Sequence, residues 1–343
     1  MSSWRGDDMS EIYPRCVQAV IDLDPTAAFC RFPHDSLPLH DMMKMSWEKY
    51  SKELWFIEAL NYVQAANPPA TAWPMSDLVR ASPLTHDIIL RELARDPGRA
   101  SEVYERREFG LRHDPTRCSM LHLAVTCLEP SLEVIDALLT AKPQLLWQSI
   151  DSTDATVDDA GCLPIHQARS ADVAMALLAA DESVIHAKDN KGRTFLHHAC
   201  RTNNLELVKL ALAQDPQALR EADSDGELPL FYVAQQSSVE LFSLVLSAWP
   251  QAAVHISSGG RRVIEKVLVH WSAEDSEHCL SMAQLLLGVD PSAASHPNDQ
   301  GQLPLHFLLH SQLGLGSIAR MYTEAVALLR LLIESSPEVR LSR

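Results

Sequence analysis

The chain has 343 residues and a formal net charge of −16, from 29 Lys and Arg against 45 Asp and Glu. Such an acidic surface repels nucleic-acid phosphates and anionic membranes, so neither is expected as a partner. Apolar residues make up 46% of the chain and aromatic residues only 6%. This balance favours a folded protein of short, closely packed helices over a sheet protein.

The seven cysteines are scattered, odd in number and free of any C-x-x-C pair. This pattern argues against a disulfide framework or a structural zinc site, and it favours a reducing compartment. The first residues lack the apolar core of a signal peptide, and no stretch approaches the ~20 apolar residues of a membrane span. We therefore expect a cytoplasmic protein without membrane insertion, and the nucleus fits equally well.

A short motif of the form Gly-x-Leu-Pro-Leu-His recurs along the chain in clear, loose and degenerate copies. The copies begin at Ser36, Cys118, Gly161, Gly192, Gly226, Gly260 and Gly301. A period of roughly 30 to 50 residues indicates a solenoid, in which each unit stacks on its neighbours. The repeats predict one elongated core in place of the two or three domains that the length alone would allow.

The units differ along the chain. We predict that residues 1–35 form the second half of a repeat without its first half. Residues 36–116 are predicted to form enlarged and degenerate repeats, which include an aromatic-rich helix at 47–66. Residues 117–343 predict a regular array. The charged segments 98–117 and 147–160 interrupt the regular spacing of the repeats. Such insertions usually form loops, which either bind a partner or are merely tolerated at the surface.

Each regular unit predicts two helices. The first begins at a proline, as at Pro164, Pro229 and Pro304, where the missing N–H is harmless and φ is already helical. Where that proline is absent, Ser119 and Thr194 stand just before the helix and offer a hydroxyl as a cap.

The second helix is predicted from apolar residues at 3.6-residue spacing, as in 205–212. It ends at a proline such as Pro216 or Pro250, because proline cannot continue a helix. Each repeat is connected to the next by a hairpin-like loop, which we call the finger. Two residues after the proline, Ala218 and Ala252 are expected to anchor this finger in the core. The finger turn reads Asp-x-x-Gly, in which the Asp bonds its own turn and the Gly takes a positive φ. The glycines expected to do so are Gly192, Gly226 and Gly301.

Together these motifs closely resemble the ankyrin repeat family, whose unit is a finger turn, a T-P-L-H helix and a return helix. Here Leu usually replaces Thr, a proline stop replaces the usual Gly-Ala, and Asn203 stands where the family prefers glycine. The resemblance implies an all-α, ankyrin-type helical repeat solenoid with short hairpin-like fingers.

In this family the histidine of the motif has a structural role and forms hydrogen bonds with the backbone near the finger. The resemblance carries that role to His40, His122, His166, His197 and His306. Equivalent histidines lie one repeat apart, roughly 10 Å by helix stacking, whereas a metal needs ligand atoms within about 2 Å of one centre. We therefore expect no metal, no cofactor and no catalytic residues.

In ankyrin repeats the finger tips and the ends of the first helices face the concave surface. By register, the partner-binding candidates are Arg169, Lys191, Arg193, Arg201, Thr202, Asp225, Glu227, Gln235, Gln236, Gln302 and His310. Their diversity, against the uniform Leu, Pro and His positions, is what a partner-specific surface would show, and also what any solvated face would show.

The sequence therefore predicts a monomeric, noncatalytic interaction module or scaffold that binds a partner protein on its concave face. No P-loop, nucleophile elbow or dinucleotide fingerprint is present. The alternative is a structural spacer, or a fragment of a larger multidomain protein whose ends pack on another domain.

Overall fold

The computed structural model describes much of the predicted repeat array. The described residues are 75, 79, 86–106, 116–127, 130–151, 160–236, 238–269, 276–311 and 322–335. The predicted half-repeat at 1–35, the aromatic-rich helix at 47–66 and His40 lie outside them. The chain divides into two compact units, one of residues 1–105 with 118–145, the other of residues 106–117 with 146–343.

The first unit packs helix α5 (His86–Arg95) against α7 (Leu132–Ala141) and the 3-10 helix η3 (Pro97–Ser101), with α6 (Met120–Thr126) against α7. Arg99 lies in η3, only 8% exposed, and its guanidinium pairs with Glu92 at 2.7 Å and with Glu102 at 3.0 Å. Arginine from the charged segment 98–117 is thus part of the packed structure.

The same segment also forms secondary structure. Strand β1 (Val103–Arg106) pairs with β2 (Thr116–Ser119) in a two-stranded sheet. The expectation of an irregular loop across 98–117 is therefore wrong at both of its ends, because backbone pairing there satisfies the N–H and C=O groups that a loop would leave to solvent.

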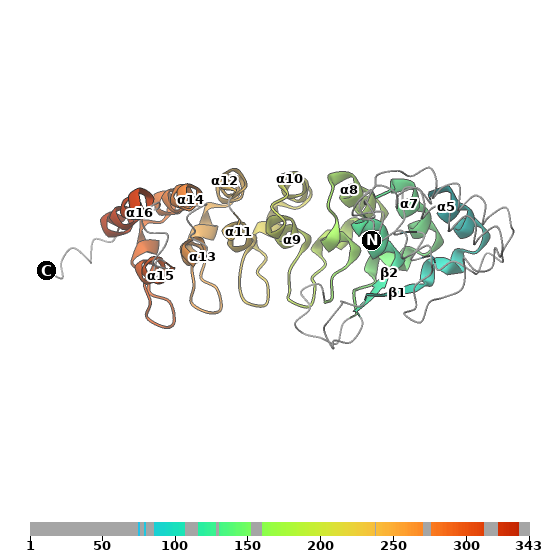
Figure 1. The fold of residues 1–343 in the computed structure, drawn as a ribbon, viewed down its shortest axis with the longest axis horizontal. Coiled ribbons are helices and arrows are strands. Elements are labelled where there is room, and N and C mark those ends of the chain that lie inside the picture. Colours follow the sequence, from blue (N-terminus) through green and yellow to red (C-terminus); the bar gives the residue numbers. More distant parts are fainter. Residues whose placement is uncertain are drawn as a thin grey trace, which may run out of the picture. The chain divides into compact units, whose positions relative to one another are not determined.

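The second unit is a stack of helix pairs joined by fingers (Figure 1). Its elements are η4 (Pro143–Trp147, which begins in the first unit), η5 (Pro164–Gln167), α8 (Ala171–Ala180), η6 (Glu182–His186), α9 (Phe195–Arg201), α10 (Leu205–Gln214), η7 (Pro216–Arg220), α11 (Pro229–Val233), α12 (Val239–Ala248), η8 (Pro250–Val254), α13 (Val263–Val269), α14 (Ser276–Val289), η9 (Pro291–Ala294), α15 (Pro304–Ser311) and α16 (Tyr322–Ser335). The first helices α9, α11, α13 and α15 form one row, and the second helices α10, α12, α14 and α16 form another. The predicted all-α repeat solenoid is confirmed.

The predicted helix starts are observed with two differences. Pro229 and Pro304 open α11 and α15, and the Ser119 hydroxyl caps α6 by accepting from His122 N. Pro164 opens only the four-residue η5, so a full first helix is missing from that repeat. The Thr194 hydroxyl lies 2.9 Å from His197 Nδ1 and bonds to that ring instead of capping the backbone.

The second helices end two residues before the proline, and the proline starts a further 3-10 turn. Asp215 lies between α10 and η7, and its side chain accepts a hydrogen bond from Gln217 N at 2.9 Å. The predicted anchors Ala218 and Ala252 are buried. The proline stop is confirmed, whereas the 3-10 turn and its Asp cap are features that the proline alone did not predict.

The finger turns have the predicted backbone. The φ angles are +74° at Gly192, +72° at Gly226 and +73° at Gly301, and Asn203 takes +52° between α9 and α10. Successive fingers are also bonded to each other, since Ser224 N donates to Lys191 O at 2.8 Å. The fingers are therefore fixed both by their own turns and by their neighbours.

Candidate functional site

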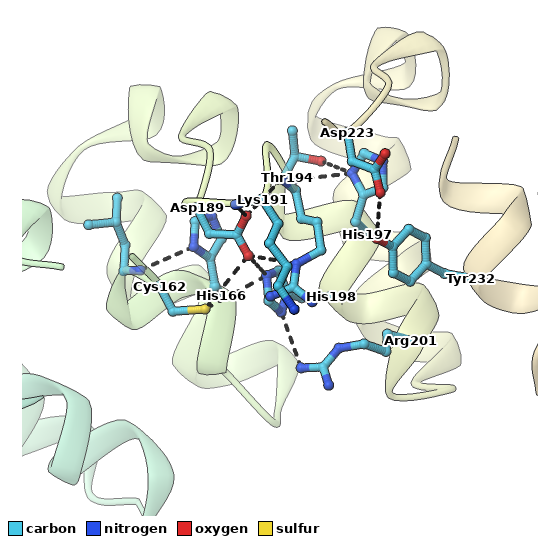
Figure 2. Close-up of polar contacts among 12 residues, drawn as sticks. Cys162, His166, Asp189, Lys191, Thr194, His197, His198, Arg201, Asp223 and Tyr232 are labelled. Atoms are coloured by element: carbon cyan, nitrogen blue, oxygen red, sulfur yellow. Dashed lines mark hydrogen bonds and ion pairs between the residues drawn. The ribbon is translucent and has the colours of Figure 1, made fainter. Parts of the chain in front are cut away.

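A buried polar cluster joins the repeat that begins at Gly161 to the one that begins at Gly192 (Figure 2). It consists of Cys162, His166, Asp189, Arg193 and His198, which are all less than 9% exposed. Cys162 and His166 lie at the start of the repeat that begins at Gly161. Asp189 and Arg193 lie on either side of the finger turn that follows, and His198 lies in α9. We refer to these five residues as the polar cluster.

Asp189 is the centre of the polar cluster. Its Oδ1 accepts from the backbone N–H groups of Lys191 and Arg193, both at 2.9 Å, as an Asp turn requires. Its Oδ2 lies 2.7 Å from Arg193 Nε and 3.0 Å from His198 Nε2. Burial acts to raise the pKa of Asp189, but hydrogen bonds from His198 and Arg193 outweigh it and hold the pKa well below its usual range.

His198 is a neutral ring with both nitrogens engaged. Its Nε2–H donates to Asp189, and Nδ1 lies 3.4 Å from Arg201 Nη2, which donates to it. Burial lowers the pKa of His198, against the opposing effect of Asp189. The ring therefore needs no further proton or ligand to satisfy its hydrogen bonds.

The polar cluster does not have the geometry of a nucleophile with its base. Cys162 Sγ lies 3.8 Å from His198 Nε2, the same nitrogen that faces Asp189. In a nucleophilic triad the base meets the nucleophile through one nitrogen and the carboxylate through the other. Cys162 is also fully buried, so a substrate has no access to its sulfur.

A metal ion is an obvious alternative, since ligand atoms of Cys162, His166 and His198 lie within 4.8 Å of one another. The two imidazole rings, however, are stacked at 15° with centroids 5.0 Å apart. A metal must lie near the plane of each ring that binds it, and two stacked, nearly parallel planes have no such common point. His166 is moreover fixed by Leu163 N and Ala187 O. The chemistry of the polar cluster is that of a satisfied hydrogen-bond network.

The repeated histidines have a shared arrangement in which the ring is held by backbone. The described rings are those of His122, His166, His197 and His306. In each, Nδ1 lies 2.8–3.3 Å from the backbone N of the residue three positions earlier. His197 Nε2 also donates to Glu227 O in the next finger at 3.3 Å. Burial lowers the pKa of His166 to about 3 and of His197 to about 4, so both rings are neutral at pH 7.

The partner-binding candidates fall into several classes of exposure. Arg169, Lys191, Thr202 and Asp225 are exposed. Arg201, Glu227, Gln235, Gln236 and Gln302 are half-buried, and the side chain of His310 lies outside the described residues. The expectation that Arg193 lies at the surface is wrong. It is 2% exposed, because its guanidinium pairs with the buried carboxylate of Asp189.

Two of the half-buried candidates are tied to neighbouring residues. Glu227 pairs with Lys266 Nζ at 2.6 Å, and its carbonyl receives the His197 ring. Arg201 contacts His198. These side chains contribute to the joints between repeats as well as to the surface.

The sequence patterns do not single out the polar cluster, although one signal was present. Adjacent residues on a helix point apart, so His197 and His198 had to face different surroundings. Only the stacking of repeats brings Cys162, from the preceding repeat, next to His198.

Part of the chain matches a known protein family. The family model described as ankyrin repeats (3 copies) matches residues 165–257. A crystal structure of an ankyrin repeat domain from Acinetobacter baumannii AYE is similar, with 18% identity, a TM-score of 0.46, and coverage of 63% of this chain and 96% of that one. The ankyrin repeat domain of Bcl-3, described as a unique member of the IkappaB protein family, has 21% identity, a TM-score of 0.45, and coverage of 68% and 93%. No curated protein sequence matches the chain.

Residues 165–257 are thus ankyrin repeats, and the resemblance inferred from the sequence is confirmed there. Ankyrin repeats are generally noncatalytic modules that bind other proteins. Within the part of the chain that the structure describes, no helix has the length and apolar character needed to cross a membrane.

Proposed function

We propose that this protein is a noncatalytic interaction module that binds a partner protein through its finger tips and the ends of its first helices. The observation that carries the proposal is the contrast between fixed backbone and varied side chains at the tips. Lys191, Asp225 and Gln300 occupy the same turn position in three fingers, and all three side chains are exposed.

The backbone at these positions is held in the same way each time. The N–H groups of Lys191, Asp225 and Gln300 donate to the side chain two residues earlier, at 2.9, 2.9 and 3.0 Å. A rigid turn that presents a different side chain in each repeat loses little conformational entropy on binding. A cationic, an anionic and a neutral tip then select a partner of complementary charge order.

The test is a charge swap that keeps the net charge constant. The variant Lys191→Glu with Asp225→Lys reverses both tips, and the matched control Glu206→Lys with Lys209→Glu reverses an exposed ion pair on α10. Both variants are expected to keep the wild-type urea midpoint, since surface changes usually alter stability by no more than about 0.5 kcal/mol.

Quantitative pull-down from native lysate compares the three proteins. A partner that the control retains and the tip variant loses would support the proposal. Identical partners for all three proteins would contradict it and would favour the spacer. The monomeric state, the cytoplasmic or nuclear location and the division into 1–35, 36–116 and 117–343 stay predictions from the sequence.

A further inference from the structure

Glu265 departs from the pattern of the repeats. It stands in α13, after Gly260-Arg261-Arg262-Val263-Ile264, at the position that histidine holds in the repeats beginning at Cys118, Gly161, Gly192 and Gly301. It is 1% exposed, and among the described residues the only group that approaches its carboxylate as a donor is the backbone N–H of Arg262, whose geometry falls short of a full hydrogen bond. An unsatisfied buried carboxylate is rare in a folded protein and calls for an explanation.

The histidine at this position shows how a polar side chain is satisfied there, whereas the preceding repeat fills the same position with the apolar Phe231. The His197 ring accepts a hydrogen bond from Thr194 N and donates one to Glu227 O, so it acts as acceptor and donor while uncharged. An ionised carboxylate can only accept, whereas a protonated carboxyl group also has an O–H to donate. Protonated Glu265 is therefore the chemical equivalent of the neutral histidine, and ionised Glu265 is not.

The neighbouring charges do little to stabilise an ionised Glu265. Arg262 Nη1 is engaged by Asp290 Oδ2 at 2.5 Å, and Lys266 Nζ by Glu227 Oε1 at 2.6 Å. Burial raises the pKa of Glu265 to about 7, and the backbone N–H of Arg262 and the charges of Arg261 and Arg262 oppose that rise only in part.

The elements that pack against α13 bring no cation that is charged throughout this range. They are α11, α14, α15 and η8. Their titratable residues with described side chains are Tyr232, Glu277, His278, Cys279 and His306. Of these, Tyr232 is bonded to Asp223, and desolvation raises its pKa far above the neutral range.

We propose that Glu265 acts as a pH-sensitive joint between repeats. Its neutral form stabilises the packing of α13 against the neighbouring helices, and its ionisation destabilises the repeat formed by residues 260–294. The sign follows from linkage. Because the folded protein binds this proton more tightly than the unfolded chain does, the stabilisation is complete below the ordinary pKa of 4.5 and is lost as the pH rises through about 7.

Hydrogen exchange tests the joint directly on the full chain. The protection factors of the Val263–Val269 amides are compared at pH 5 and pH 8.5 in the wild type and in Glu265→Gln, which keeps the shape of the side chain and cannot ionise. We expect the wild-type factors to fall by roughly 50- to 100-fold relative to those of the variant, because the pKa of Glu265 rises from 4.5 to about 7 on folding. The Phe195–Arg201 amides should respond equally in both proteins.

Equal pH dependence of Val263–Val269 in the two proteins would overturn the proposal. If Glu265→Gln does not fold, the carboxyl carbon of Glu265 can be titrated by NMR in the wild type. A midpoint at or above about 6 would support the joint. A midpoint near the ordinary 4.5 would overturn it.

Discussion

Replacing a finger glycine by alanine should separate the strain within a turn from the stacking between turns. Gly226 and Gly301 have almost the same φ, +72° and +73°. A Cβ at Gly226 would lie 2.8 Å from Ser258 N in the next finger, whereas a Cβ at Gly301 would meet no described atom within 4 Å. Gly301→Ala is therefore a matched control for Gly226→Ala.

The magnitudes follow from two contributions. A left-handed φ costs an L-residue about 1–2 kcal/mol, and both variants incur that penalty. In Gly226→Ala the added Cβ also displaces Ser258, whose N–H donates to Asp225 O at 2.9 Å. Loss of that hydrogen bond adds about 0.5–1.5 kcal/mol and the steric shift adds more, so a total of about 2–4 kcal/mol is expected.

Urea unfolding, followed by far-ultraviolet circular dichroism, measures both free energies of unfolding. Gly192→Ala serves as a second test, because its Cβ would lie 2.9 Å from Ser224 N. The variants at Gly192 and Gly226 should both lose at least about 1 kcal/mol more than Gly301→Ala. Equal losses in all three variants would show that the contact between fingers contributes nothing, and would refute the reasoning.

Three further predictions concern polar side chains within the repeat array. Arg193→Met should lower the free energy of unfolding by about 3–5 kcal/mol in urea titrations, because it leaves the buried carboxylate of Asp189 without its guanidinium partner. The control Lys191→Ala should change the free energy of unfolding by less than about 0.5 kcal/mol. Asp215→Ala should cost about 0.5–2 kcal/mol, measured by the same titration, through loss of its 3-10 cap. Because burial lowers the pKa of His197 to about 4, its contribution to stability is complete above the ordinary 6.5 and lost as the pH falls toward 4. The urea midpoint should therefore drop in acid, and by less in His197→Asn; an equal drop in both would contradict the assignment.

Much of the fold could be predicted from the sequence because its determinants are local. The positive φ of Gly192 and Asn203, the proline start of α11 and the buried anchor Ala218 each depend on a few neighbouring residues. Recurrence of the same local pattern then implied the stack, since a unit of two short helices cannot bury its apolar face alone. Sequence and structure agree at these positions because backbone geometry or periodicity decides the outcome there.

The surroundings of single polar residues depended on the tertiary structure. Arg193 and Lys191 lie two positions apart in one finger, yet the first is buried against Asp189 and the second is exposed. Likewise, only the stacking of repeats brings Cys162 next to His198 and leaves the Glu265 carboxylate buried with no well-formed hydrogen bond among the described residues. The sequence by itself determined the repeat, its turns and its helices, because these are short-range properties of the chain. Only the tertiary structure decided which charges are buried and what pairs with them, because burial and pairing depend on residues that packing, and not sequence distance, brings together.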